Sequence, residues 1–277
     1  MGPILDFVHY PFLFKALICG LLLATLCGML SPLIVAKRFA FMGASISHGA
    51  LLGVSLGLAL LKDQEPIDSA LLFFITLVVT LIAVAPLAWS TFRQRIPSDA
   101  LIGLFFTGTM GLGLILHQAT GAAKGDLLSY LFGNILTLGT FDIALLITLT
   151  ITILPLLYIY RWRWMIFLFD EEGGHIQGIS TKKYHFILYT MLTLVIVAGL
   201  KLSGVILINS FLLIPGIFAL KWAPNARATF TYAIIFALKS TALGFYLANL
   251  CDFPMGATLA VTQVFLYFLS FAFKYKK

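Results

Sequence analysis

Long apolar runs recur along the chain and are separated by short polar interruptions. The runs are apolar on every face and lack the polar alternation of a membrane β-strand. About 20 consecutive apolar residues span the hydrocarbon layer of a bilayer as a helix, so each run predicts a membrane-spanning segment. The predicted segments are residues 12–36, 39–61, 69–91, 100–116, 141–160, 186–200, 229–250 and 255–273. Two shorter stretches, 127–138 and 205–220, are ambiguous.

The composition agrees with this pattern. Hydrophobic residues make up 61% of the 277 residues, and charged residues make up only 10%. The sequence therefore predicts an all-α, polytopic helical membrane protein with eight to nine transmembrane segments. The three cysteines are interpreted as small packing residues, because no pair has the spacing of a disulfide or a CxxC site.

Basic residues predict the orientation, because Lys and Arg concentrate in cytoplasmic loops. They cluster at 37–38, 93–95, 161–163, 182–183, 221–227 and 274–277, whereas 63–68 and Asp252 have an acidic bias. Placing every basic cluster inside puts the N-terminus outside and the C-terminus inside, which requires nine crossings if 205–220 spans. The residues behind the net charge of +7 are then interpreted as an orientation signal and as contacts with lipid headgroups. They are not interpreted as a surface that binds nucleic acid.

The longest polar interruption, residues 161–183, is predicted on the cytoplasmic side. Asp170, Glu171 and Glu172 favour the first turn of a short helix, and Gly178 suits its C-terminal cap. An ordinary amphipathic surface loop is the alternative interpretation.

Five stretches resemble, in the same order, segments of the permease subunits of ATP-binding-cassette (ABC) importers for zinc, manganese or iron. They are VAKRFAFMGASISH (35–48), SDALIGLFFTGTMGLGLIL (98–116), DLLSYLFGNILTL (126–138), LSGVILINSFLLIPGIFAL (202–220) and DFPMGAT (252–258). The resemblance covers nearly the whole chain, and it implies a single permease domain over residues 1–277 in a bacterial plasma (inner) membrane.

The resemblance also implies partners. It implies a homodimer or pseudo-dimer of permeases around a central pathway, cytoplasmic ABC ATPase subunits, and an extracytoplasmic metal-binding protein that delivers the ion. The loop at about 165–183 then corresponds to the family's coupling helix, with Asp170, Glu171, Glu172, Gly173, Gly174 and Gly178 as its candidate residues. The chain lacks the phosphate-binding pattern GxxxxGK(S/T), so it is expected to be no enzyme, with ATP hydrolysis on a separate subunit.

His48 is the main candidate for contact with the ion. Ser45, Gly49, Gly53 and Gly57 recur every four residues and predict a helix face that another helix can approach closely. His48 lies about 100° around the helix from this stripe, facing the bundle interior or the pathway. An intramembrane imidazole is costly to expose to lipid and suits Zn, Mn or Fe. A structural histidine bonded to a neighbouring helix is the alternative.

Ala44 marks a departure from the resembled family, which has Asp four residues before this histidine. One imidazole from each of two subunits is a poor site for a hard cation such as Mn²⁺. Ser45, Ser47 and water are candidates to complete a loose shell, and Asn209 is a further polar residue in an apolar segment. Zinc is favoured over manganese or iron, because GALLG after His48 lacks the proline that many manganese permeases have. No permanently bound cofactor is expected.

The remaining polar residues have simpler interpretations. Asp99, Asp126 and Asp142 each open an apolar segment and are predicted to cap helices. His117, His175 and His185 lie at segment ends or in the loop and are expected to be solvated. Lys239, in the middle of a segment, has no assigned role.

Two other functional classes compete with an ABC permease. An ion- or proton-coupled secondary transporter would use His48 as a proton relay, and an ATPase that co-purifies through residues 161–183 would exclude it. An intramembrane protease is disfavoured, because Ile46 stands where a GxSxG motif has glycine and HExxH is absent.

Overall fold

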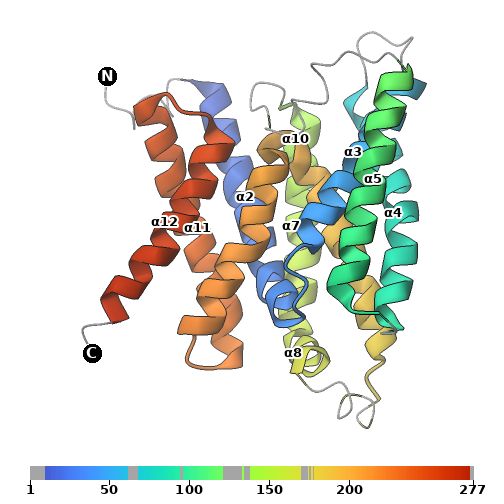
Figure 1. Ribbon diagram of the computed structural model, residues 1–277. Coiled ribbons are helices and arrows are strands. Elements are labelled where there is room, and N and C mark those ends of the chain that lie inside the picture. Colours follow the sequence, from blue (N-terminus) through green and yellow to red (C-terminus); the bar gives the residue numbers. More distant parts are fainter. Residues whose placement is uncertain are drawn as a thin grey trace.

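The computed structural model describes residues 10–61, 68–93, 96–120, 133, 138–169, 174, 176 and 178–274. This part of the chain is helical and contains no strand (Figure 1). The helices are α2 (Pro11–Ala36), α3 (Met42–Leu60), α4 (Ser69–Phe92), α5 (Ser98–Thr120), α7 (Thr140–Ile159), α8 (Arg161–Phe169), α10 (Thr181–Trp222), α11 (Ala226–Cys251) and α12 (Met255–Lys274).

Eight of these helices are long and apolar enough to cross a membrane, and α8 is the short exception. The predicted all-α polytopic class is therefore confirmed. Most predicted boundaries differ from the observed ones by one to three residues, but α5 extends the predicted 100–116 to 98–120. The ambiguous stretch 127–138 lies almost entirely outside the described residues.

α10 combines the predicted segments 186–200 and 205–220, and the chain reverses direction between them. Gly204 has φ 65° and ψ 173°, a conformation that only glycine adopts readily. A Cβ added at Gly199 would lie 3.1 Å from Cδ1 of Ile208, although a straight helix would separate the two positions by about 13 Å. The two halves meet at the upper end in Figure 1, so α10 crosses the bundle twice.

Counting α10 twice gives nine crossings among the described residues. α2 accordingly begins at the upper end of the bundle in Figure 1 and α12 ends at the lower end. The helix ends next to Lys37, Arg93, Arg161 and Arg227 all lie at the lower end, so the excess of positive charge predicts that this is the cytoplasmic end.

The core is built around α2, which packs against α10, α11 and α7. α2 is apolar on every side, as expected of a helix surrounded by other helices. Its closest contact with α10 is at Ser31, whose hydroxyl oxygen accepts a 2.6 Å hydrogen bond from the backbone N–H of Gly216. A Cβ at position 216 would lie 2.6 Å from the Ser31 backbone, so this approach requires glycine.

His185 is buried, so the expectation that it is solvated is wrong. Its Nε2 lies 3.0 Å from the carbonyl oxygen of Ala88 and 3.1 Å from the hydroxyl of Thr91. Thr91 also shares a 2.8 Å hydrogen bond with the hydroxyl of Tyr189. Helix α10 begins at Thr181, which places His185 in its second turn and turns the ring toward α4. His117 is likewise buried, and His175 lies outside the described residues.

Gly204→Ala is predicted to destabilise the protein by about 1–3 kcal/mol, because alanine disfavours the backbone conformation of the reversal. The measurement is the midpoint of thermal unfolding of the purified protein in detergent, followed by tryptophan fluorescence. Gly108→Ala is the matched control, since it lies within helix α5 and a Cβ there would meet nothing within 4 Å. Equal midpoints for the two variants would contradict the assignment of Gly204 as the reversal.

Candidate functional site

The small-residue stripe of α3 lies against α4 and α5. A Cβ at Gly53 would come within 2.8 Å of a backbone carbonyl oxygen of α4, so only glycine permits this approach. The contacts along the stripe are Ser45 with Ile102, Gly49 with Phe105, Gly53 with Thr76 and Gly57 with Leu72. This face of α3 is therefore closed by its own chain.

A second face of α3 is left partly uncovered. Ala44, His48, Leu52 and Leu56 are half-buried at four-residue spacing, whereas most other positions of the helix are buried. The four residues form one stripe along the helix, which we call the open face of α3. It is the surface on which His48 can meet something outside the described chain.

The His48 ring packs edge-on against Phe106 of α5, with ring centroids 4.6 Å apart and an interplanar angle of 82°. Its Nδ1 has no hydrogen-bond partner within the described part of the chain. No described residue therefore supports the alternative interpretation, in which His48 is hydrogen-bonded through Nδ1 to a neighbouring helix. Nδ1 is itself buried although the ring is half-buried, so an ion would reach this nitrogen only if the side chains around it moved. A neutral imidazole nitrogen without a hydrogen bond can then act as a ligand.

Asn209 lies beside the first turn of α3, on the second half of α10. Its Oδ1 has no hydrogen-bond partner among the described residues and would lie 3.0 Å from a Cβ added at Gly43. Like His48, Asn209 is half-buried. The reversal at Gly204 thus brings an amide oxygen to the same helix that carries the imidazole.

Ser45 and Ser47 point away from the open face. The Ser45 hydroxyl donates to the carbonyl oxygen of Ile102 at 3.1 Å, and the Ser47 hydroxyl donates to that of Gly43 at 2.8 Å. Both side chains are fully buried. Within the described residues there is also no group of three His, Cys, Asp or Glu side chains that could hold a metal ion. Among the described residues of one copy, His48 and Asn209 are therefore the predicted site residues that have a buried polar atom without a hydrogen bond.

The predicted coupling residues Asp170, Glu171, Glu172 and Gly173 lie outside the described residues. Gly174 is helical and buried, and Gly178 has φ 72°, which suits the C-terminal cap predicted for it. The end of α8 and the start of α10, which flank this segment in the sequence, lie at the lower end of the bundle in Figure 1.

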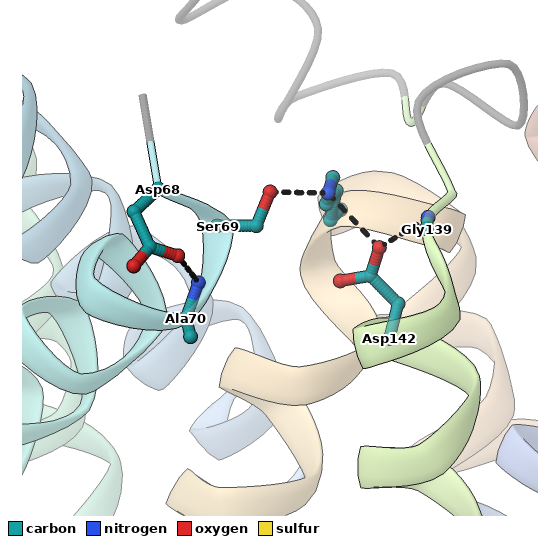
Figure 2. A network of polar contacts seen from close by, with 6 residues as sticks. Asp68, Ser69, Ala70, Gly139 and Asp142 are labelled. Atoms are coloured by element: carbon teal, nitrogen blue, oxygen red, sulfur yellow. Dashed lines mark hydrogen bonds and ion pairs between the residues drawn. The ribbon is translucent and has the colours of Figure 1, made fainter. Parts of the chain in front are cut away.

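The other end of the bundle carries a charge network that joins three helices (Figure 2). Lys201 donates to Oδ2 of Asp142 at 2.9 Å and makes a longer contact of 3.5 Å with the hydroxyl of Ser69. Asp142 also accepts a 2.8 Å hydrogen bond from the backbone N–H of Gly139, which confirms its predicted capping role. The ion pair ties the reversal of α10 to the start of α7.

The other acidic residues near predicted helix starts have different outcomes. Asp68 caps α4 by accepting a 2.9 Å hydrogen bond from the backbone N–H of Ala70. Asp99 lies in the first turn of α5, as predicted, and Asp126 lies outside the described residues.

Lys239 is exposed in the middle of α11 and forms no ion pair with a described residue. α11 packs against α2, α10 and α12 and lies on the far side of α2 from α3 in Figure 1. The charge of Lys239 is therefore remote from His48 and does not oppose a cation there.

Comparison with known proteins assigns the chain to a family. A model of the ABC 3 transport family matches residues 9–274. The chain belongs to this family. The resemblance to ABC permeases drawn from five short stretches is thereby confirmed.

Two relatives show the range of ions within the family. The high-affinity zinc uptake system membrane protein ZnuB of Haemophilus influenzae is 29% identical over 94% of this chain and 97% of its own length. The manganese transport system membrane protein MntB of Synechocystis is 30% identical over 95% of this chain and 83% of its own length. The predicted preference for zinc is not resolved by these names.

A solved structure has the same fold. PsaBC from Streptococcus pneumoniae, in complex with Fab, contains a chain that is 27% identical, with a TM-score of 0.83. The match covers 97% of this chain and 94% of that chain. The nine-crossing bundle is therefore the fold of an ABC transporter membrane subunit.

Replacing Lys201 by Met or Asp142 by Asn is predicted to destabilise the protein by about 1.5–3 kcal/mol in each case, because each change leaves one partner of a partly buried, charged hydrogen bond unpaired. The double variant should be more stable than the sum of the two single losses predicts. Thermal unfolding of all four proteins measures the coupling energy. Strictly additive losses would show that the two side chains act independently.

Proposed function

We propose that this chain is the membrane permease of an ABC importer for a divalent transition-metal ion, with zinc as the favoured cargo. Membership of the ABC 3 transport family and the zinc and manganese relatives support the class of cargo. The observation that carries the proposal is the open face of α3, where the His48 ring is half-buried and its Nδ1 has no hydrogen-bond partner among the described residues. Asn209, whose Oδ1 also has no described partner, lies beside Gly43 at the start of the same helix.

The open face of α3 is proposed to face a second copy of the chain across the central pathway. Two copies would supply two imidazoles and two amide oxygens, with water completing the shell of the ion. Imidazole suits zinc, whereas the missing carboxylate at Ala44 removes the oxygen ligand that manganese prefers. Few ligands also mean weak binding, and weak binding allows the ion to leave toward the cytoplasm.

The remaining parts of the importer are proposed to be separate chains. Cytoplasmic ATPase subunits would dock on the coupling loop at about 165–183 and hydrolyse ATP. An extracytoplasmic metal-binding protein would deliver the ion at the opposite end, where Lys201 and Asp142 lie. Residues 1–277 would form one permease domain in the plasma (inner) membrane of a bacterium, without a resident cofactor.

His48→Ala is predicted to reduce uptake of zinc at limiting concentration about tenfold or more, the factor expected for losing about 1.4 kcal/mol of ion contact. The measurement is uptake of radioactive zinc by cells that depend on this importer. Ser47→Ala is the matched control, because its hydroxyl is buried and bonded within α3. Unimpaired uptake of zinc, manganese and iron by His48→Ala would contradict a pathway role.

Ala44→Asp is predicted to increase uptake of manganese relative to zinc. Position 44 shares the open face with His48, so an Asp there adds a carboxylate oxygen four residues away on the same helix. Ala44→Asn has nearly the same size without the charge and should change the ratio much less. The measurement is competition between the two ions in uptake assays, and an unchanged ratio in Ala44→Asp would contradict the proposed lining.

A further inference from the structure

A cavity of about 260 Å³ opens at the cytoplasmic end between the short helix α8 and the start of α11. It lies apart from the open face of α3 and from the charge network. Its lining residues are Arg161, Trp162, Met165, Ala226, Arg227 and Phe230. The two arginines come from different helices, so the cavity depends on the tertiary fold and not on one local sequence.

The mouth of the cavity is positively charged. Neither Arg161 nor Arg227 forms an ion pair with a carboxylate in the described part of the chain. Their guanidinium groups lie instead over aromatic rings: Arg161 is 4.7 Å from the Tyr158 ring and Arg227 is 5.8 Å from the Trp162 ring. Two guanidinium groups at one opening, neither paired with a described carboxylate, favour an anion, and guanidinium suits phosphate oxygens in particular.

The interior of the cavity is apolar. Met165 and Phe230 form part of its wall and also line a smaller, adjoining recess. Pro32, Leu168, Leu220 and Thr229 complete that recess. That recess, of about 10 Å³, is too small for a hydrocarbon chain, so only the cavity of about 260 Å³ can hold one. Two guanidinium groups together with the apolar walls of Met165, Ala226 and Phe230 match a molecule with an anionic head and a hydrocarbon tail better than a small hydrophilic anion.

The surroundings place this opening at the membrane surface. Trp162 is 60% exposed and Tyr158 is 61% exposed, at the junction of α7 and α8. Aromatic residues of this kind concentrate where the bilayer meets water. α8 itself buries Trp164 and Phe167 against the bundle, so Arg161 and Trp162 lie toward the lipid headgroups and not toward the core.

We propose that this cavity binds an anionic phospholipid of the cytoplasmic leaflet. The phosphate would lie between Arg161 and Arg227, and the first part of an acyl chain would lie along Met165 and Phe230. Basic pockets between transmembrane helices on the cytoplasmic side recognise such headgroups. The lipid would join α8 to α11 and so hold in place the helix that leads into the coupling loop.

The test uses native mass spectrometry of the full-length protein in mild detergent, titrated with dioleoyl-phosphatidylglycerol. Dioleoyl-phosphatidylcholine, with the same tails and no net charge, is the comparison lipid. The wild-type protein should retain phosphatidylglycerol with the higher affinity. The double variant R161Q/R227Q should bind phosphatidylglycerol about tenfold more weakly or worse, and phosphatidylcholine equally well, because it loses two charged hydrogen-bonding groups.

The matched control is R93Q/K182Q. Arg93 and Lys182 also flank a tryptophan at the cytoplasmic end, at 5.0 and 5.1 Å from the Trp89 ring, but they do not line the cavity. This variant loses the same charge and should retain wild-type affinity for phosphatidylglycerol. An equal loss in both variants would overturn the proposal, because it would show attraction by net charge alone.

Two further outcomes would also overturn it. Displacement of the lipid by inorganic phosphate would identify a phosphate site without a role for the acyl chain. Loss of a co-purifying ATPase subunit in R161Q/R227Q, with lipid affinity unchanged, would identify a protein contact.

A second experiment is used if R161Q/R227Q fails to fold. The wild-type protein and Trp162→Phe are each titrated with phosphatidylglycerol that has brominated acyl chains. This lipid should quench the tryptophan fluorescence of the wild-type protein more than that of Trp162→Phe, and equal quenching would contradict the proposal.

Discussion

The reversal of α10 at Gly204 is the constraint on which the rest of the structure depends. A helix of 42 residues is about twice the length that a bilayer accommodates, so the chain must turn at the membrane surface. Gly204 permits that turn through a positive φ, and Gly133 packs directly on it. A Cβ at Gly133 would lie 2.6 Å from the carbonyl oxygen of Leu202, so any residue other than glycine would clash at this position. The turn makes the number of crossings odd and carries Asn209 back toward α3.

Close packing on one side of α3 is what leaves its other side available. Because glycines let α4 and α5 approach the backbone of α3, the helix is held mainly on that side, and the open face contributes only partial contacts such as His48 with Phe106 and Leu52 with Gly113. His48 can therefore stay partly uncovered without loss of the packing that fixes α3. The buried hydroxyl of Ser45 belongs to the holding side, since it bonds to the backbone of α5. Separation of the two faces allows one short helix to be both a structural and a pathway element.

The sequence was sufficient for the fold class, for most helix boundaries and for the family, because hydrophobicity and short motifs are local properties. It was insufficient for side-chain partners and burial, because these depend on which helices pack against each other in the folded chain. The partner of Asp142 is Lys201, which lies 59 positions away on another helix. His185 was expected to be solvated because it lies at the end of a predicted segment, yet it is buried against α4. Ser45 and Ser47 were candidate ligands by proximity in sequence to His48, but the helix turns them toward other backbone groups.

The two polar ends of the bundle are held by different physical means, and this difference bears on transport. At the extracytoplasmic end, Lys201 and Asp142 join α7 and α10 by a partly buried ion pair, with side-chain exposures of 21% and 11%. At the cytoplasmic end, buried polar groups join α4 and α10 through Thr91, His185 and Tyr189. Salt screens the attraction between partly exposed charges, whereas hydrogen bonds between buried groups are much less sensitive to it. The end at which entry of the ion is proposed is therefore the one whose helix contacts depend more on ionic strength.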